Sequence, residues 1–184
     1  MFENTLYRLV HDKQCVLGYF GGSITEGAGA SSGATCYRAL VTDWFRQRYP
    51  EADIREIQAA IGGTGSDLGM YREETDLLSK QPDLVFLEFA VNDGGVPYER
   101  ILRQSETILR KLFAHNPYAE VVSILTTTGS VGELLESGGE YVSRSAYCTI
   151  SHHYNIPVID VGNVLHYAVI RSGGDFHRYT TDTV

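Results

Sequence analysis

Cysteine is scarce in this chain: only Cys15, Cys36 and Cys148 occur among 184 residues, and they lie far apart. An odd number of widely spaced cysteines forms neither a disulfide framework nor the closely spaced ligand set of a zinc site. The chain also begins without the basic and then apolar segments of a signal peptide. We therefore expect a cytoplasmic protein. A protein whose leader had been removed would look the same, so secretion is the alternative.

Positive charge is in the minority. Fifteen lysines and arginines stand against 23 aspartates and glutamates, which gives a formal net charge of −8. Nucleic acids and anionic membranes bind basic surfaces, so this balance disfavours both as partners. No apolar run reaches the ~18 residues that a membrane-spanning helix needs. We expect no nucleic-acid partner and no membrane partner, and nothing in the sequence indicates an oligomeric state.

Internal repeats, low-complexity tracts and domain linkers are absent as well. With 184 residues, of which 43% are hydrophobic, the chain is long enough to bury a core of its own. We expect a single domain over residues 1–184. Apolar runs predict five strands and helical periodicity predicts five helices. The strands are expected at 16–20, 53–60, 83–90, 120–128 and 156–161, and the helices at 35–49, 66–80, 97–115, 141–154 and 163–171.

From residue 16 onward, the predicted elements alternate between strand and helix. Such alternation is typical of a doubly wound α/β fold, in which right-handed crossovers place helices on both faces of a parallel sheet. We expect a three-layer α/β/α sandwich with a flavodoxin-like five-stranded sheet in the order 2-1-3-4-5. The stretches 129–139 and 172–184 are expected to be loops. In the helix at 35–49, one face carries the apolar side chains Tyr37, Leu40, Val41, Trp44 and Phe45.

Glycine-rich or polar turns follow the first three predicted strands. They carry Ser23 in GGSITEG (21–27), Gly63 in IGGTG (61–65) and Asn92 in VND (91–93). In the expected order these strands are neighbours, so their turns meet at the carboxyl edge of the sheet, where ligands bind. The Ser23 hydroxyl can act as a nucleophile. The backbone N–H groups of Ser23 and Gly63 and the Asn92 amide can donate to an oxyanion. The alternative is that Gly63 and Asn92 only form turns.

The three turns resemble, in the same order, the first three sequence blocks of the SGNH hydrolases, also called GDSL-type esterases and lipases. The resemblance implies a flavodoxin-like α/β/α sandwich, with Ser23 as the nucleophile and Gly63 and Asn92 as oxyanion-hole residues. The chain departs from the family pattern at two positions. Gly22 replaces the usual aspartate before the serine, and Ala90 replaces the usual glycine two residues before Asn92.

The family's fourth block is Asp-x-x-His, in which the histidine is the general base. This chain has Asp182 followed by Thr183 and Val184, and the position expected for the histidine comes directly after Val184. We therefore expect that the C-terminal end of the domain is missing and that the 184-residue chain is impaired as an enzyme. His177 is the nearest substitute, but its spacing differs from the pattern. The other five histidines are expected at partly exposed positions in or beside helices.

The resemblance implies a serine ester hydrolase that acts on short-chain acyl esters, including carbohydrate O-acetyl groups, without a cofactor or metal. The alternative is a non-catalytic flavodoxin-like domain that binds a small molecule or a nucleotide. The phosphate-binding patterns G-x-x-x-x-G-K-[ST] and G-x-G-x-x-G are absent, and the turns lack lysine and arginine. An α/β-hydrolase is disfavoured because Thr25 stands at the last glycine of G-x-S-x-G.

Two further carboxylates, Glu88 and Asp93, lie close to the third turn. Glu88 lies in an otherwise apolar strand, where a buried charge is costly unless hydrogen bonds compensate it. It either braces the serine turn or reaches the polar end of its strand. Asp93 is expected to cap the turn that follows Asn92.

Overall fold

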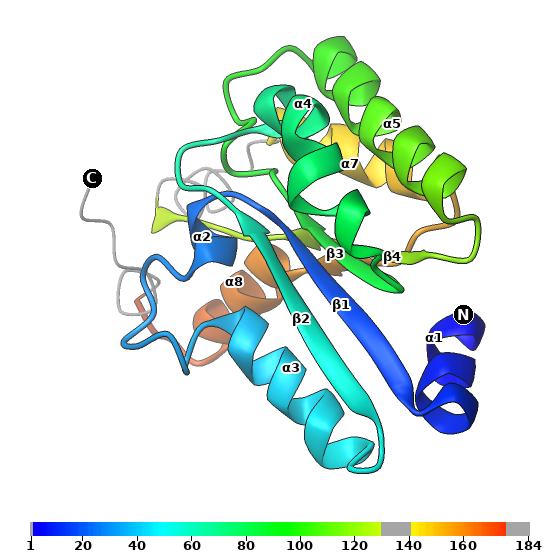
Figure 1. Cartoon of the computed structure of the whole chain (residues 1–184). Coiled ribbons are helices and arrows are strands. Elements are labelled where there is room, and N and C mark those ends of the chain that lie inside the picture. The colour runs from blue at the N-terminus through cyan, green and yellow to red at the C-terminus, as the bar shows by residue number, and fades with distance from the viewer. Residues whose placement is uncertain (1, 130–140, 176–184) are drawn as a thin grey trace.

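The computed structural model describes residues 2–129 and 141–175. Five parallel strands form one sheet in the order β2-β1-β3-β4-β5 (Figure 1). The predicted α/β class and strand order are therefore confirmed. The strands are β1 (Gln14–Gly21), β2 (Asp53–Ala60), β3 (Leu84–Glu88), β4 (Glu120–Leu125) and β5 (Val158–Asp160).

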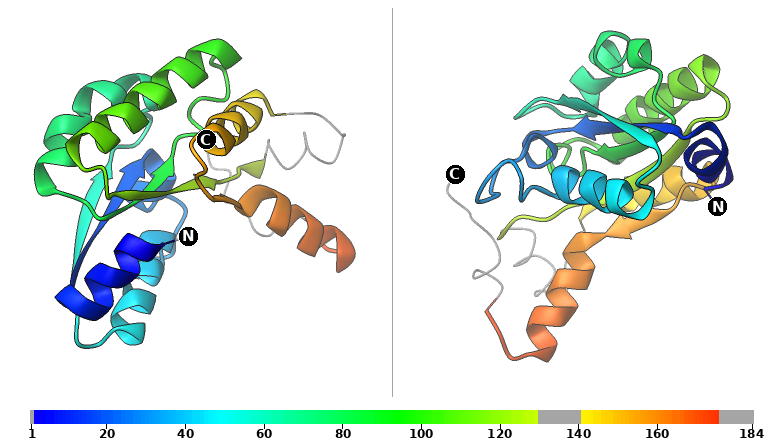
Figure 2. Two further views of the ribbon diagram at one scale, coloured as in Figure 1. Left: turned by 90° about the vertical axis from the view of Figure 1, so that its right-hand side faces the viewer. Right: turned by 60° about the horizontal axis from the view of Figure 1, so that its bottom comes forward.

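Helices cover both faces of this sheet, which gives three layers. One face carries α4 (Ser66–Asp76), α5 (Tyr98–His115) and α7 (Val142–His153), and the other carries α1 (Glu3–Tyr7) and α3 (Tyr37–Arg48) (Figures 1 and 2). The helix α8 (Val161–Arg171) follows β5 and extends away from the sheet (Figure 2). The one-turn helix α2 (Ser23–Glu26) directly follows β1. Two short helical turns, η1 (Arg8–Asp12) and η2 (Leu78–Lys80), complete the described elements.

The two cores follow from the alternation of side chains along the central strands. In β1, Val16 and Phe20 belong to the core under α4, α5 and α7, whereas Leu17 and Tyr19 belong to the core on the opposite face. All five residues of β3 are buried, as expected for a central parallel strand that is covered on both sides. The edge strand β2 instead alternates between buried and exposed residues. The apolar run of β3 is therefore continuous because this strand is central, and the pattern of β2 alternates because this strand lies at the edge of the sheet.

The apolar face predicted for α3 is only partly buried. Tyr37, Val41 and Phe45 pack against the core, but Leu40 and Trp44 are 55% and 57% exposed. A helix that covers the edge of a sheet buries only a narrow stripe of its surface. Leu40 and Trp44 lie beside that stripe, one turn apart, and remain in solvent. The prediction that five side chains share one face was therefore correct, but that face is not buried over its whole width.

No element was predicted for residues 3–12, which the structure folds into α1 and η1. Leu9 and Thr5 are buried there. The carboxylate of Glu120, at the start of β4, accepts the backbone N–H groups of Asn4 (3.3 Å) and Thr5 (2.9 Å). This short helix is therefore stabilised by a distant residue, because five residues alone do not form a stable helix. Across the described ranges, no helix is long and apolar enough to span a membrane.

Candidate active site

The structure brings the three predicted turns together at the carboxyl edge of the sheet. Ser23 is the first residue of α2, Gly63 lies between β2 and α4, and Asn92 follows β3. A methyl group added to Gly22 would lie 2.0 Å from Oδ1 of Asn92. A methyl group added to Gly62 would lie 3.6 Å from Cβ of Ser23. The first turn therefore contacts both of the others, as the strand order predicted.

The groups expected to bind an oxyanion are not engaged by other described residues. The N–H of Ser23 is at the start of a helix, where no intrahelical acceptor exists. Neither the N–H of Gly63 nor the side-chain amide of Asn92 is hydrogen-bonded within residues 2–129 and 141–175. The same holds for the Ser23 hydroxyl, and both Ser23 and Asn92 are half-exposed. Three donors and one hydroxyl can thus face a ligand.

Glycine is required at two of these positions for different reasons. Gly63 has φ of +73°, a left-handed conformation that side chains with a Cβ rarely adopt. Gly22 has ordinary extended backbone, but its Cα lies against the Asn92 amide, so that any Cβ would displace that amide. The departure from the family's aspartate at position 22 therefore sets the place of the Asn92 side chain. The second departure is harmless, because the Ala90 methyl group is buried in the core.

Glu88 braces the serine turn, which decides between its two interpretations. Its side chain is fully buried, and its Oε2 accepts the hydroxyl of Thr25 in α2 at 2.8 Å. Its Oε1 accepts the hydroxyl of Thr126, after β4, also at 2.8 Å. Because Thr25 donates to Glu88, the hydroxyl of Tyr37 must donate to Thr25 (2.8 Å). Burial raises the pKa of Glu88, and the hydrogen bonds from Thr25 and Thr126 oppose that rise.

Asp93 caps a distant helix, contrary to the expectation that it caps its own turn. It is 1% exposed, and its Oδ1 accepts the N–H of Ser66, the first residue of α4, at 3.0 Å. Its Oδ2 accepts the hydroxyl of Tyr147 in α7 at 2.7 Å. Burial raises the pKa of Asp93 against these hydrogen bonds. The negative end of the side chain therefore lies at the positive end of the α4 dipole, and it ties the Asn92 turn to two helices.

The helix α7 holds the same turn at two further points. The hydroxyl of Ser143 donates to the carbonyl of Ala90 at 2.5 Å, and the hydroxyl of Tyr141 donates to the carbonyl of Val91 at 3.2 Å. These contacts were missed in the sequence, where Ser143 and Tyr141 are ordinary residues at the start of a helix. They fix the backbone that presents Asn92.

Asp182 and His177 lie outside the described residues, and the position expected for the base comes after Val184. Four of the five described histidines are exposed: His11, His115, His152 and His153. They lie in η1 or in the last turn of α5 or α7, and each of these three helices directly precedes a strand. This position places them at the amino edge of the sheet, opposite Ser23. His166 in α8 is only 8% exposed, which corrects the expectation that it is a surface residue. Ser23 thus has no histidine partner among the four at the amino edge.

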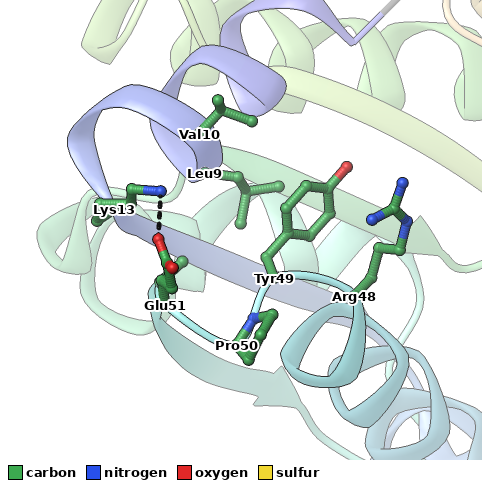
Figure 3. A pocket seen from close by; sticks show the side chains of 8 residues that line it. Leu9, Val10, Lys13, Arg48, Tyr49, Pro50 and Glu51 are labelled. Atoms are coloured by element: carbon green, nitrogen blue, oxygen red, sulfur yellow. Dashed lines mark hydrogen bonds and ion pairs between the residues drawn. The ribbon is translucent and has the colours of Figure 1, made fainter.

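The described residues offer no metal centre, because no group of three or more His, Cys, Asp or Glu side chains gathers there. A pocket of about 210 Å³ lies at the amino edge, between η1 and the turn from α3 to β2 (Figure 3). Lys13 and Glu51 form an ion pair of 2.8 Å beside it. Leu9, Val10, Lys13, Arg48, Tyr49, Pro50, Glu51 and Ala52 line this pocket. It is therefore separate from the three turns.

Solved structures similar to this chain carry the same fold. Two are of a two-domain esterase (CEX) active on acetylated mannans, one co-crystallised with mannopentaose. Each is 30% identical, and the chain superposes over 98% of its length with TM-scores of 0.81 and 0.82. The chain spans about half of that esterase, 49% and 51% of the two structures. TesA is 21% identical with a TM-score of 0.64 over 78% of this chain and 76% of its own, which supports the fold alone.

No curated protein matches the chain in sequence. The GDSL-like lipase/acylhydrolase family, in contrast, matches residues 19–183, a range that includes the serine, glycine and asparagine turns. The match agrees with the strand order and with the contact between these turns at one edge of the sheet. The chain therefore belongs to the GDSL-like lipase/acylhydrolase family.

Proposed function

We propose that this chain forms the hydrolytic site of a serine esterase that acts on short-chain acyl esters. The observation that carries the proposal is the convergence, at the carboxyl edge of the sheet, of one serine hydroxyl and three hydrogen-bond donors that no other described residue engages. Such donors stabilise the negative charge that develops on a carbonyl oxygen when a nucleophile attacks. A domain that only bound a neutral ligand would not need this combination.

In the proposed reaction, Oγ of Ser23 attacks the carbonyl carbon of the ester and gives its proton to a general base. The carbonyl oxygen becomes an oxyanion between the N–H groups of Ser23 and Gly63 and the amide of Asn92. The tetrahedral intermediate collapses, the alcohol leaves with a proton from the base, and Ser23 is acylated. Water then attacks the acyl-serine by the same steps and releases the carboxylic acid. Asp182 is assigned the role of orienting the base.

An O-acetylated carbohydrate is the substrate class that we favour. The two structures that share 30% identity with this chain are of an esterase active on acetylated mannans. Apart from Ile24, Ile61 and Val91, the turns around Ser23 consist of small and polar residues. Gly62 and Gly63 are exposed, which suits a small acyl group on a bulky polar alcohol. Hydrolysis of acetyl-mannan should therefore exceed that of long-chain acyl esters such as 4-nitrophenyl palmitate.

The first test replaces the nucleophile. In a gene product that includes the position after Val184, Ser23→Ala should reduce the hydrolysis of 4-nitrophenyl acetate by at least about 10³-fold, because removal of a nucleophile leaves only the residual effect of the oxyanion site. Ser32→Ala, at an exposed serine of the following loop, is the matched control and should keep full activity. Hydrolysis that survives Ser23→Ala would overturn the proposal.

The second test concerns the base. The pattern that assigns Asp182 puts the histidine directly after Val184, so the 184-residue chain is expected to hydrolyse esters several orders of magnitude more slowly than a gene product that includes that position. The two proteins should be compared on 4-nitrophenyl acetate. Equal activity would show that the base lies inside the 184 residues, and His177→Ala would then be the first variant to make.

A further inference from the structure

Arg72 in α4 holds the ends of two neighbouring strands. Its Nη1 donates to the carbonyl of Ala59 at 2.7 Å, and its Nη2 donates to the carbonyl of Gly21 at 2.9 Å. Ala59 is the second-last residue of β2 and Gly21 is the last residue of β1, so both carbonyls lie just before the turns that carry Gly63 and Ser23. The guanidinium therefore bridges the two strands where they leave the sheet.

The same guanidinium also reaches the second turn itself. Nη2 lies 3.4 Å from Oγ1 of Thr64, whose own proton is donated to the carbonyl of Ile61 at 2.7 Å, so Thr64 accepts from Arg72. The guanidinium carbon stacks 4.7 Å from the centre of the Phe20 ring. Planar stacking and several donors in one fork are properties of arginine that lysine does not share.

Glu26 holds the second turn from its other side. Its Oε2 accepts the N–H of Gly62 at 2.8 Å. Glu26 is the last residue of α2, the helix that begins with Ser23, so this bond joins the helix of the serine directly to the turn. Gly63 thus lies between two fixed neighbours, Gly62 held by Glu26 and Thr64 held by Arg72.

Burying the Arg72 guanidinium destabilises the folded state, which a purely structural contact would not require. The Arg72 side chain is 12% exposed, and its Nε is buried without an acceptor in the described part of the chain. A buried donor without a partner destabilises the folded state, and such groups in native proteins call for an explanation. Its carboxylate contact, Asp76, lies one turn further along α4 at 3.1 Å, away from the turns. The contacts of Arg72 instead fix Thr64 and, through it, the neighbouring Gly63.

We propose that Arg72 and Glu26 are positioning residues, which fix the N–H of Gly63 relative to Ser23 by holding the turn at 61–65 from both sides. The inference rests on the proposed function, because the position of this N–H matters only if it binds the oxyanion. Misplacement of a reacting or stabilising group by about 1 Å can reduce catalysis by about 10²-fold.

Amide exchange measured by NMR tests the positioning without any need for activity. In Arg72→Lys, the amides of Ile61 and Gly62 should exchange about tenfold faster, although their acceptors, the Gly21 carbonyl and the Glu26 carboxylate, are still present. In Glu26→Ala, the amide of Thr64 should exchange faster although its acceptor, the Ile61 carbonyl, is unchanged. Unchanged exchange in both variants would overturn the inference.

Kinetics on 4-nitrophenyl acetate, measured in the gene product that includes the position after Val184, give the second readout. Arg72→Lys and Glu26→Ala should each lower kcat about 10- to 100-fold with KM within about threefold, because the oxyanion donors act in the transition state. Glu26→Gln keeps an acceptor oxygen and should restore kcat to near that of the original protein. Arg110→Lys, at a 71% exposed arginine of α5, is the matched control for the arginine change and should alter neither parameter.

The outcomes separate the two proposals. If Ser23→Ala keeps its activity, the proposed function fails, and the exchange data still decide whether the turn is held as inferred. If Ser23→Ala is inactive and the positioning variants keep the original kcat and exchange rates, the inference alone is overturned. Should Arg72→Lys fail to fold, Glu26→Ala decides the question, because Glu26 is an exposed residue whose replacement leaves the core intact.

Discussion

Glu73 should make the stability of this protein fall as the pH rises. The residue lies in α4 with no exposed surface, and neither carboxylate oxygen has a hydrogen-bond partner within the described residues. Burial raises its pKa from 4.5 to about 8, against the attraction of Lys111. Between these two values the folded protein holds a proton that the unfolded chain has lost. The free energy of unfolding must therefore decrease with increasing pH in this range.

The size of the effect follows from the two pKa values. Each full pH unit between them is worth about 1.4 kcal/mol, and the carboxyl titrates only partly near each pKa. The contribution from Glu73 therefore falls by about 3.5 kcal/mol between pH 5 and pH 8. For a domain of this size, 1 kcal/mol shifts Tm by about 2–4 °C. Glu73→Gln keeps the shape of the protonated side chain but cannot ionise. It should match the original protein within about 1 kcal/mol at pH 5 and raise Tm by roughly 7–14 °C relative to it at pH 8.

The assay is thermal unfolding of both proteins at pH 5, 6, 7 and 8, followed by circular dichroism. Other buried carboxylates, including Glu88 and Asp93, are present in both proteins, so their effects cancel in the difference. Glu99→Gln, at an exposed residue of α5, is the control and should follow the original protein throughout. Parallel curves for Glu73→Gln and the original protein would refute the reasoning, because Glu73 would then be ionised in the folded state.

Two further predictions concern the asparagine turn. In an active gene product that includes the position after Val184, Asn92→Ala should lower kcat for 4-nitrophenyl acetate by about 10²–10³-fold with an unchanged circular dichroism spectrum, as for the loss of one oxyanion donor; turnover within about threefold of the original would make Asn92 a turn residue. Gly22→Ala should also lower kcat, by at least about tenfold, because its Cβ would lie 2.0 Å from Oδ1 of Asn92 and displace the amide. Tm should change little, since the half-exposed Asn92 side chain can rotate away; equal kcat would show that the amide plays no part.

The sequence was sufficient for the elements that local patterns determine. The continuous apolar run of β3 and the heptad-like spacing of Ile101, Ile108 and Leu112 in α5 depend only on which neighbours along the chain share a face. The Ser23, Gly63 and Asn92 turns were visible because each combines a strand end with a residue type that suits a specific backbone or donor role. Strand order then predicted that the turns meet. The roles of these residues and of Asp182 stay predictions.

Only the tertiary structure decided what lies around these turns, because the partners are far apart in sequence. Glu88 binds Thr25 and Thr126, which are 63 and 38 residues away, and no local pattern relates them. Asp93 caps a helix that begins 27 residues earlier, which made the expectation of a local cap wrong. Whether Trp44 is buried depends on how much of α3 the sheet edge covers. The sequence by itself determined the elements and the three turns, since propensity and periodicity are local; the braces that hold the turns arise only when the strands pack side by side.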